Sequence, residues 1–294
     1  MPMSGADIPR PSEIETYHIM SYDRISPKKS GFDAKGKTVF ITGGAGGIGY
    51  AIAQSFAAAG VSKVVITSRS PESQNKAKKE LNASFPDVEI VTIPVSLEDL
   101  DAMTKALNSA GPIDVLVLNA YYSHQLNVPS STISACEIGK TFQANVVANW
   151  HLIQTYINST PAPASGSKTI IAVSSAGSHL SIPGNTGYAA SKAALNRIID
   201  MQADEYTPKK NGVTLLSFHP GIIYTPGAKQ YFSEDAFVYE DVKLPGDFAV
   251  WLASKEAQFL HGRFVWGQWD VDELVALKQR VEKEPTFLKI GLVY

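Results

Sequence analysis

The feature that most constrains the fold of this chain is a glycine-rich loop between an apolar run and an alanine-rich run, over residues 37–60. The run KTVFIT is typical of a short buried strand, and residues 47–59 predict a helix that ends at Gly60. Between them, TGGAGGIG lets the backbone approach a bound phosphate closely, and the helix N-terminus directs its amides at the same point. Strand, loop and helix in this order indicate a nucleotide-binding unit rather than a tight turn alone.

The glycines of this loop fit three spacings: G-x-G-x-x-G, G-x-x-G-x-x-G and T-G-x-x-x-G-x-G. Spacing alone does not choose among them. The sequence G-x-x-x-x-G-K-[ST] is absent, which argues against an ATP-type phosphate loop.

Apolar runs alternate with helical patterns along most of the chain. Continuous apolar runs in such an alternation predict a parallel sheet with both faces covered. Strands are expected at 37–42, 64–67, 88–93, 112–120, 169–173, 213–218 and 263–267, and helices at 47–59, 71–84, 96–108, 133–157, 186–206, 247–254 and 271–284. We therefore predict a single α/β domain with a doubly wound, Rossmann-like parallel sheet, whose ligands bind at the carboxyl ends of the strands.

Two segments lie outside this alternation. Residues 1–35 are rich in proline and polar residues and are expected to form an arm, loose or packed on the surface, before a domain at 36–294. Residues 226–245 are polar and aromatic by turns, which is typical of a lid or a substrate-binding insertion.

The residues after the second strand indicate which dinucleotide is bound. An acidic residue there binds the ribose 2′-hydroxyl of NAD, whereas this chain has Ser68 and Arg69. A guanidinium pairs with a phosphate through two hydrogen bonds. The pattern favours NADP(H), with a solvated loop arginine as the alternative.

Tyr188 and Lys192 are four residues apart in a predicted helix, so that both side chains lie on one face. A phenol has a pKa near 10, and a close ammonium favours its ionised form. Ser175, just after the strand at 169–173, is placed to bond the oxygen that the phenol protonates. Taken alone, a Tyr and a Lys one turn apart on a helix lie more often on its solvent-exposed face than in a catalytic site. The serine and the upstream glycine loop favour an acid–base role.

Composition excludes several classes of function. A net charge of −2 argues against a nucleic-acid partner, and Cys136 is the sole cysteine, so no disulfide forms within the chain. The six histidines show no metal-ligand spacing. No run approaches the length of a membrane span, and the first residues lack the apolar core of a secretion signal. We expect a cytoplasmic protein without a metal.

Together these motifs resemble the short-chain dehydrogenase/reductase family over residues 37 to about 270, in its single-domain branch with T-G-x-x-x-G-x-G and Y-x-x-x-K. The resemblance selects Ser175, thirteen residues before Tyr188, as the catalytic serine, and places Asn145 at the family's helix-borne asparagine. The catalytic residues that it implies are Ser175, Tyr188, Lys192 and Asn145. The cofactor contacts that it implies are Gly43, Gly47, Ile48, Gly49, Ser68, Arg69, Asn119, Tyr188, Lys192, Ile223 and Thr225.

Two departures from the family pattern stand out. The family's N-N-A-G appears here as Leu118-Asn119-Ala120-Tyr121, with a bulky side chain where glycine is usual. The Asp-Val pair that contacts adenine after the third strand appears as Pro94-Val95.

The expected function is an NADP(H)-dependent interconversion of a carbonyl and a secondary alcohol. Alternatives are a nicotinamide-dependent epimerase or dehydratase, and a non-catalytic dinucleotide-sensing protein of the same fold. An apolar or aromatic small molecule is the expected substrate, and the helices at 133–157 and 186–206 resemble the family's homodimer and homotetramer faces. Candidate pocket residues are Tyr121, Tyr122, His179, Ile182, Tyr224, Tyr231 and Phe232.

Overall fold

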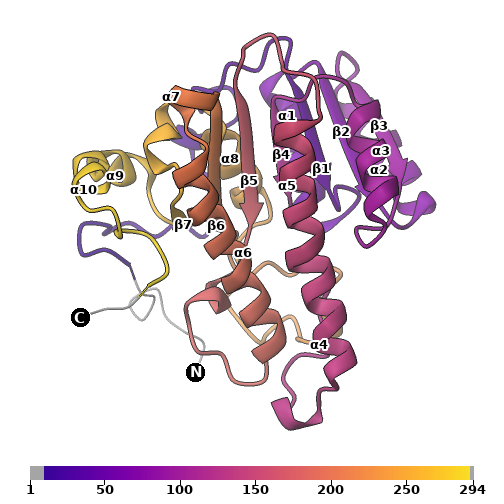
Figure 1. Cartoon of the computed structure of the whole chain (residues 1–294), viewed down its shortest axis with the longest axis vertical. Helices are drawn as coiled ribbons and strands as arrows, with labels where there is room; N and C mark the ends of the chain where they lie inside the picture. The colour runs from indigo at the N-terminus through magenta and orange to yellow at the C-terminus, as the bar shows by residue number, and fades with distance from the viewer. Residues whose placement is uncertain (1–9, 292–294) are drawn as a thin grey trace.

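Seven parallel strands form one sheet in the order β3-β2-β1-β4-β5-β6-β7, in a computed structural model that describes residues 10–291 (Figure 1). Chain order reverses between β1 and β4, where a doubly wound sheet opens a crevice at its carboxyl edge. The strands are β1 (Thr38–Thr42), β2 (Lys63–Ser68), β3 (Glu89–Pro94), β4 (Val115–Leu118), β5 (Lys168–Val173), β6 (Val213–His219) and β7 (Phe264–Trp266). The predicted single-domain α/β fold is confirmed.

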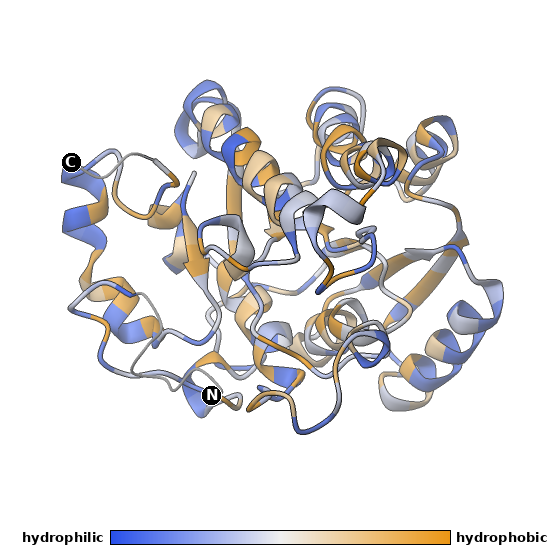
Figure 2. Cartoon of the chain, turned by 90° about the horizontal axis from the view of Figure 1, so that it is seen from below, coloured by the Kyte–Doolittle hydropathy of each residue, from blue (hydrophilic) through white to orange (hydrophobic). Residues whose placement is uncertain are grey.

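Helices cover both faces of the sheet, because successive strand side chains point to opposite sides. Val39 and Ile41 belong to one buried cluster, and Phe40 between them belongs to the other. The first cluster includes α1 (Gly47–Ala59), α2 (Pro71–Ser84) and α8 (Lys243–Leu252), and the second includes α3 (Leu100–Ser109), α5 (Asn149–Asn158) and α6 (Thr186–Glu205). Figure 2 shows hydrophobic strands enclosed by helices with hydrophilic outer faces.

Four predicted helices differ from the observed ones. The helix expected at 96–108 begins four residues later, as α3 at Leu100, where the side chain of Asp99 caps it. The helix expected at 133–157 is α4 (Ala135–Phe142), a π-helical turn η4 (Gln143–Ala148) and α5. The terminal helix breaks into α9 (Val271–Ala276) and α10 (Lys278–Lys283). α8 starts four residues earlier than expected, since a proline in a first helical turn needs no hydrogen-bond partner for its nitrogen.

Short helical turns complete the fold. They are η2 (Asp23–Ile25), η3 (Ser130–Thr132), η5 (Ala176–Ser178), α7 (Pro208–Asn211), η6 (Ala228–Gln230) and η7 (Glu256–Leu260). Within the segment at 226–245, Phe237 packs against both Phe232 and Tyr239, and Tyr239 also packs against Tyr224. The aromatic side chains of this segment thus pack largely on one another.

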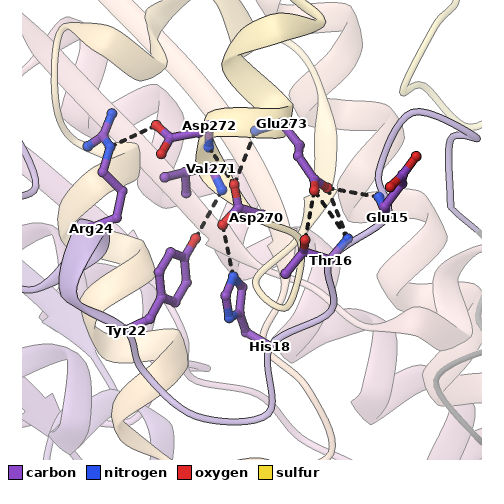
Figure 3. A network of polar contacts seen from close by, with 9 residues as sticks. All are labelled: Glu15, Thr16, His18, Tyr22, Arg24, Asp270, Val271, Asp272 and Glu273. Atoms are coloured by element: carbon purple, nitrogen blue, oxygen red, sulfur yellow. Dashed lines mark hydrogen bonds and ion pairs between the residues drawn. The ribbon is translucent and has the colours of Figure 1, made fainter.

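The described part of the N-terminal arm, residues 10–35, is docked on the C-terminal part of the chain (Figure 3). Tyr17 forms an antiparallel bridge with Trp269, and the backbone amides of Glu15 and Thr16 donate to the carboxylate of Glu273. The side chain of Ile25 is fully buried. Residues 10–35 therefore contribute to the hydrophobic core, and residues 1–9 of the expected arm lie outside the described part of the chain.

Asp247 of α8 joins the arm to the helix after the glycine loop. Its carboxylate is fully buried and accepts hydrogen bonds from Ser21 at 2.5 Å and Ser55 at 2.7 Å, and it also pairs with Lys243. Ser21 lies in the arm and Ser55 in α1, so one carboxylate fixes three segments that are distant in sequence.

Replacing Asp247 by Ala removes the acceptor of two hydroxyl groups and leaves a cavity. We expect the free energy of unfolding to fall by about 2–3 kcal/mol. Urea denaturation measures the change. The matched control is Glu89→Ala, which breaks the exposed 3.4 Å pair with Lys63 and should cost less than about 1 kcal/mol. Equal losses in the two variants would contradict this role of Asp247.

Candidate active site

The loop between β1 and α1 is shaped by its glycines. Gly43 and Gly47 have positive φ angles of 67° and 54°, a region that other residues rarely adopt. A Cβ atom at Gly49 would lie 2.4 Å from the carbonyl oxygen of Gly43 and 2.5 Å from Nδ2 of Asn119. The loop therefore turns tightly enough for its backbone amides and the start of α1 to surround a phosphate.

Asn119 and Thr42 lock this loop to the next strand. Asn119 Nδ2 donates to the carbonyl oxygens of Thr42 at 2.9 Å and Gly43 at 3.3 Å. In return, Thr42 Oγ1 accepts from the amides of Asn119 and Ala120, both at 3.0 Å. Asn119 thus supports the cradle from the end of β4, where the sheet order reverses.

A cavity of about 340 Å³ extends from the glycine loop along the carboxyl ends of β2 and β3. Eight of the expected cofactor residues line it: Gly43, Gly47, Ile48, Gly49, Ser68, Arg69, Asn119 and Thr225. The cavity also includes Val95, Ser96, Leu97 and Glu98 beyond β3, and Tyr121, Tyr122 and Gly227 toward α6. An elongated dinucleotide fits this lining, with its pyrophosphate at the glycine loop.

Arg69 stands at one end of the cavity with an exposed side chain. The end of β2 before it is rigid, because Gln74 Nε2 donates to the carbonyl oxygens of Ser68 at 3.0 Å and Ile93 at 2.7 Å. Ser70 caps α2 by accepting from the amide of Ser73. The backbone that carries Arg69 is thus fixed by hydrogen bonds on both sides, at one end of the cavity.

Tyr188 and Lys192 lie in the first turns of α6, and Ser175 follows β5. The Ser175 hydroxyl lies close enough to the Tyr188 phenol to influence its ionisation. Lys192 is buried, and its Nζ donates to the carbonyl oxygen of Val173 at 2.8 Å and lies 5.8 Å from the centre of the Tyr188 ring. The three predicted residues are therefore brought together.

Burial controls the ionisation of this group. It raises the pKa of Tyr188 above its ordinary value, the Tyr121 phenol raises it further, and the Ser175 hydroxyl acts in the opposite direction. Burial also lowers the pKa of Lys192 to about 8. The sequence predicted a tyrosine made more acidic by the lysine. In the structure the shift runs the other way: burial is the largest influence on the pKa of Tyr188 and raises it, and Ser175 rather than Lys192 is the group that lowers it.

Tyr121 lies between the cavity and the catalytic group. Its ring packs edge-on against Tyr188 with centroids 5.7 Å apart, and Lys192 Nζ lies 5.5 Å from its centroid. Its hydroxyl approaches Gly227, where an added Cβ would be 3.2 Å away. Tyr121, which stands where the family pattern has glycine, thus separates the cavity from the group formed by Ser175, Tyr188 and Lys192.

Asn145 lies in the π-helical turn and is fully buried. Its amide accepts from the backbone N–H of Tyr122 and donates to the carbonyl oxygen of the same residue, both at 2.8 Å. It also donates to Ser191 Oγ at 3.0 Å, and Ser191 donates to the carbonyl oxygen of Tyr188 at 2.7 Å. The side chain therefore links the loop after β4 to the backbone of the tyrosine.

Ten expected site residues lie outside the cavity lining: Asn145, Ser175, His179, Ile182, Tyr188, Lys192, Ile223, Tyr224, Tyr231 and Phe232. Ile223 is buried in the loop after β6, and His179 packs against Phe264 and Trp266 and accepts from the indole N–H of Trp266. Sequence reasoning missed Ser96–Glu98 of the cavity and His124, whose ring accepts from the amide of Tyr188. The cavity segment follows a predicted strand end, but nothing in the local sequence indicated His124.

Within residues 10–291 no group of three or more His, Cys, Asp or Glu side chains is arranged to hold a metal ion. Among the described helices, none combines the length and the apolar character needed to cross a membrane.

Comparisons with known proteins agree with this geometry. The family model described as short chain dehydrogenase matches residues 37–236. The short chain dehydrogenase/reductase nsrO of Aspergillus novofumigatus is 46% identical over 287 residues, 97% of each chain. A solved short chain dehydrogenase/reductase family protein is 26% identical with a TM-score of 0.69, over 80% of this chain and 97% of that one.

The L-sorbose reductase of Gluconobacter frateurii, solved with NADPH and L-sorbose, has a TM-score of 0.68 at 21% identity, over 80% of this chain and 96% of that one. At that identity it shows the shared fold alone. The family model and the curated relative carry the assignment: the chain belongs to the short-chain dehydrogenase/reductase family.

Proposed function

We propose that this oxidoreductase is NADP(H)-dependent and interconverts the carbonyl and secondary alcohol forms of a small aromatic or apolar molecule. The observation that carries the proposal is the buried Tyr188 phenol beside Lys192, packed against Tyr121, which lines the cavity next to the glycine loop. A positioned phenol can donate its proton to a carbonyl oxygen, and the phenolate can take the proton back in the reverse reaction.

The chain's residues divide the work of this reaction. Ser175 Oγ accepts from the amide of Gly177 at 3.2 Å, which leaves its own proton free to bond the substrate oxygen. Tyr188 transfers its phenolic proton to that oxygen as the carbonyl carbon is reduced. Lys192 keeps a positive charge beside the phenol and replaces part of the lost solvation of the phenolate. The nicotinamide group, when bound, supplies the hydride to the carbonyl carbon.

The aromatic character of the pocket supports the substrate class. Tyr121 and Tyr122 line the cavity, and the phenol of Tyr231 lies close enough to both to raise their pKa values. Flat aromatic surfaces with hydroxyl edges suit a substrate that combines a ring with polar substituents. A panel of aromatic and aliphatic ketones, with NADPH oxidation as the readout, tests this assignment.

We also propose a homodimer or homotetramer through the outer faces of η4, α5 and α6. Val147, Trp150 and Met201 are large apolar residues that remain 43%, 46% and 54% exposed on these elements. Sedimentation analysis of the purified chain measures the assembly.

Tyr188→Phe removes the proton donor and retains the ring. Proton transfer by a positioned side chain contributes about 10²–10⁴-fold to rate, so we expect kcat to fall by that factor while the Kd for NADPH stays within about two-fold. Tyr206→Phe, at the other end of α6, is the control and should behave as the wild type. Near-normal kcat in Tyr188→Phe would refute the proposed function.

Arg69→Ala tests the cofactor preference. Hydrogen bonds to a charged group are worth about 1.5–3 kcal/mol, so KM for NADPH should rise about 10–100-fold, whereas KM for NADH should not change. The control is Lys78→Ala, which removes another exposed cation from α2. An equal effect on both cofactors would show that Arg69 does not bind the 2′-phosphate.

The pKa of Lys192 predicts the pH dependence. With a pKa lowered to about 8, the ammonium is present below pH 8 and lost above it, whereas Tyr188 stays protonated through this range. We expect kcat/KM for NADPH, which reports on the free enzyme, to decline above about pH 8. Lys192→Arg keeps its charge and should lose this decline even if its absolute rate is lower. A wild-type profile that is flat to pH 9.5 would contradict the assignment.

A further inference from the structure

His124 lies in the loop after β4, outside the lining of the cavity, and only 2% of it is exposed. Its Nδ1 lies 2.6 Å from the carbonyl oxygen of Gln125, and its Nε2 lies 3.3 Å from the backbone nitrogen of Tyr188. A carbonyl oxygen only accepts and an amide N–H only donates. The ring is therefore neutral, with its proton on Nδ1 and a lone pair on Nε2 directed at the tyrosine amide.

The start of α6 needs such an acceptor. The first amides of a helix have no partner within it, and the residue before the helix commonly supplies one from its side chain. Here that residue, Asn185, makes no capping hydrogen bond, and its Oδ1 accepts instead from the amide of Asn127. His124 thus takes over part of the capping from a different segment of the chain.

Gly187 makes the close approach possible. A Cβ at this position would lie 2.7 Å from Nε2 of His124 and 2.4 Å from Cδ1 of Ile138. Any other residue would force the imidazole or the helix start to move. The contact between His124 and the tyrosine backbone therefore depends on a glycine immediately before Tyr188.

The loop after β4 also holds the backbone carbonyl group of Tyr188, through Asn145 and Ser191. Asn145 holds both backbone groups of Tyr122 and bonds Ser191, which donates to the Tyr188 carbonyl oxygen. The loop after β4 therefore holds the N–H of Tyr188 through His124 and its C=O through Asn145. This loop also carries Tyr121, which lines the cavity and packs against the Tyr188 ring. The loop therefore fixes the Tyr188 phenol relative to the cavity.

We propose that His124 is a positioning residue for Tyr188: its Nε2 caps the first turn of α6 and fixes the backbone from which the phenol reaches the substrate oxygen. The inference rests on the proposed function of Tyr188 as the proton donor. A displacement of about 1 Å at a reacting group lowers rate by about 10²-fold, so the effect is expected on kcat rather than on cofactor binding.

The test compares two variants of matched size. His124→Phe keeps a planar ring and removes the acceptor, whereas His124→Gln presents an amide oxygen at a similar reach. We expect kcat in His124→Phe to fall about 10–100-fold, with KM for the ketone and Kd for NADPH within about two-fold of the wild type. His124→Gln should recover kcat to within about three-fold of the wild type.

Gly187→Ala provides an independent route to the same displacement. It should lower kcat to a similar extent, and the double variant with His124→Phe should be little worse than either alone, because both remove one contact. If His124→Phe does not fold, His124→Asn, whose side chain is too short to reach the amide, replaces it.

Wild-type kcat in His124→Phe, or equal losses in the Phe and Gln variants, would overturn the inference. So would a loss that appears in KM and Kd as much as in kcat, which is what a general disturbance of the loop would give. Activity in Tyr188→Phe would instead refute the proposed function. An inactive Tyr188→Phe beside a fully active His124→Phe would refute this inference alone.

Discussion

The structure depends on the reciprocal hydrogen bonds between Thr42 and Asn119 at the carboxyl ends of β1 and β4. These strands are neighbours in the sheet but are separated in sequence by two helix-linked strands, so their connections leave on opposite faces and open the crevice. The same amide group that joins the two strands also packs against Gly49 and holds the phosphate loop in shape. The same contacts therefore hold the two strands together and shape the glycine loop, so a substitution that breaks them would disturb both.

Burial of the catalytic group follows from this arrangement. α6 lies across the face of the sheet, with Leu195 and Ile199 in the core, and so brings its first turn beneath the loops that follow β4 and β5 (Figure 1). Enclosure by these loops keeps the Tyr188 phenol neutral and makes the Lys192 ammonium easier to deprotonate. The shifted pKa values of both groups are thus a consequence of packing.

Sequence patterns predicted the sheet and eight residues of the cavity lining, because the strands are continuous apolar runs and these residues lie at or just beyond strand ends. Ser68, Arg69 and Asn119 could be placed from strand order alone. The π-helical turn around Asn145 could not, because helix, π-turn and helix share one hydrophobic periodicity. The docking of the arm and the hydrogen bond from Tyr188 to His124 join residues more than 60 positions apart, and no local pattern records such contacts.

Tyr121 shows how one departure from a family pattern changes a site. A glycine at this position would leave the Tyr188 ring open toward the cavity, whereas the Tyr121 ring packs edge-on against it and its phenol opposes ionisation. The same side chain reaches the segment after β6 at Gly227 and so closes the space between the glycine cradle and α6. The tyrosine at this position therefore contributes both to the raised pKa of the Tyr188 phenol and to the aromatic surface of the cavity, because one side chain faces both.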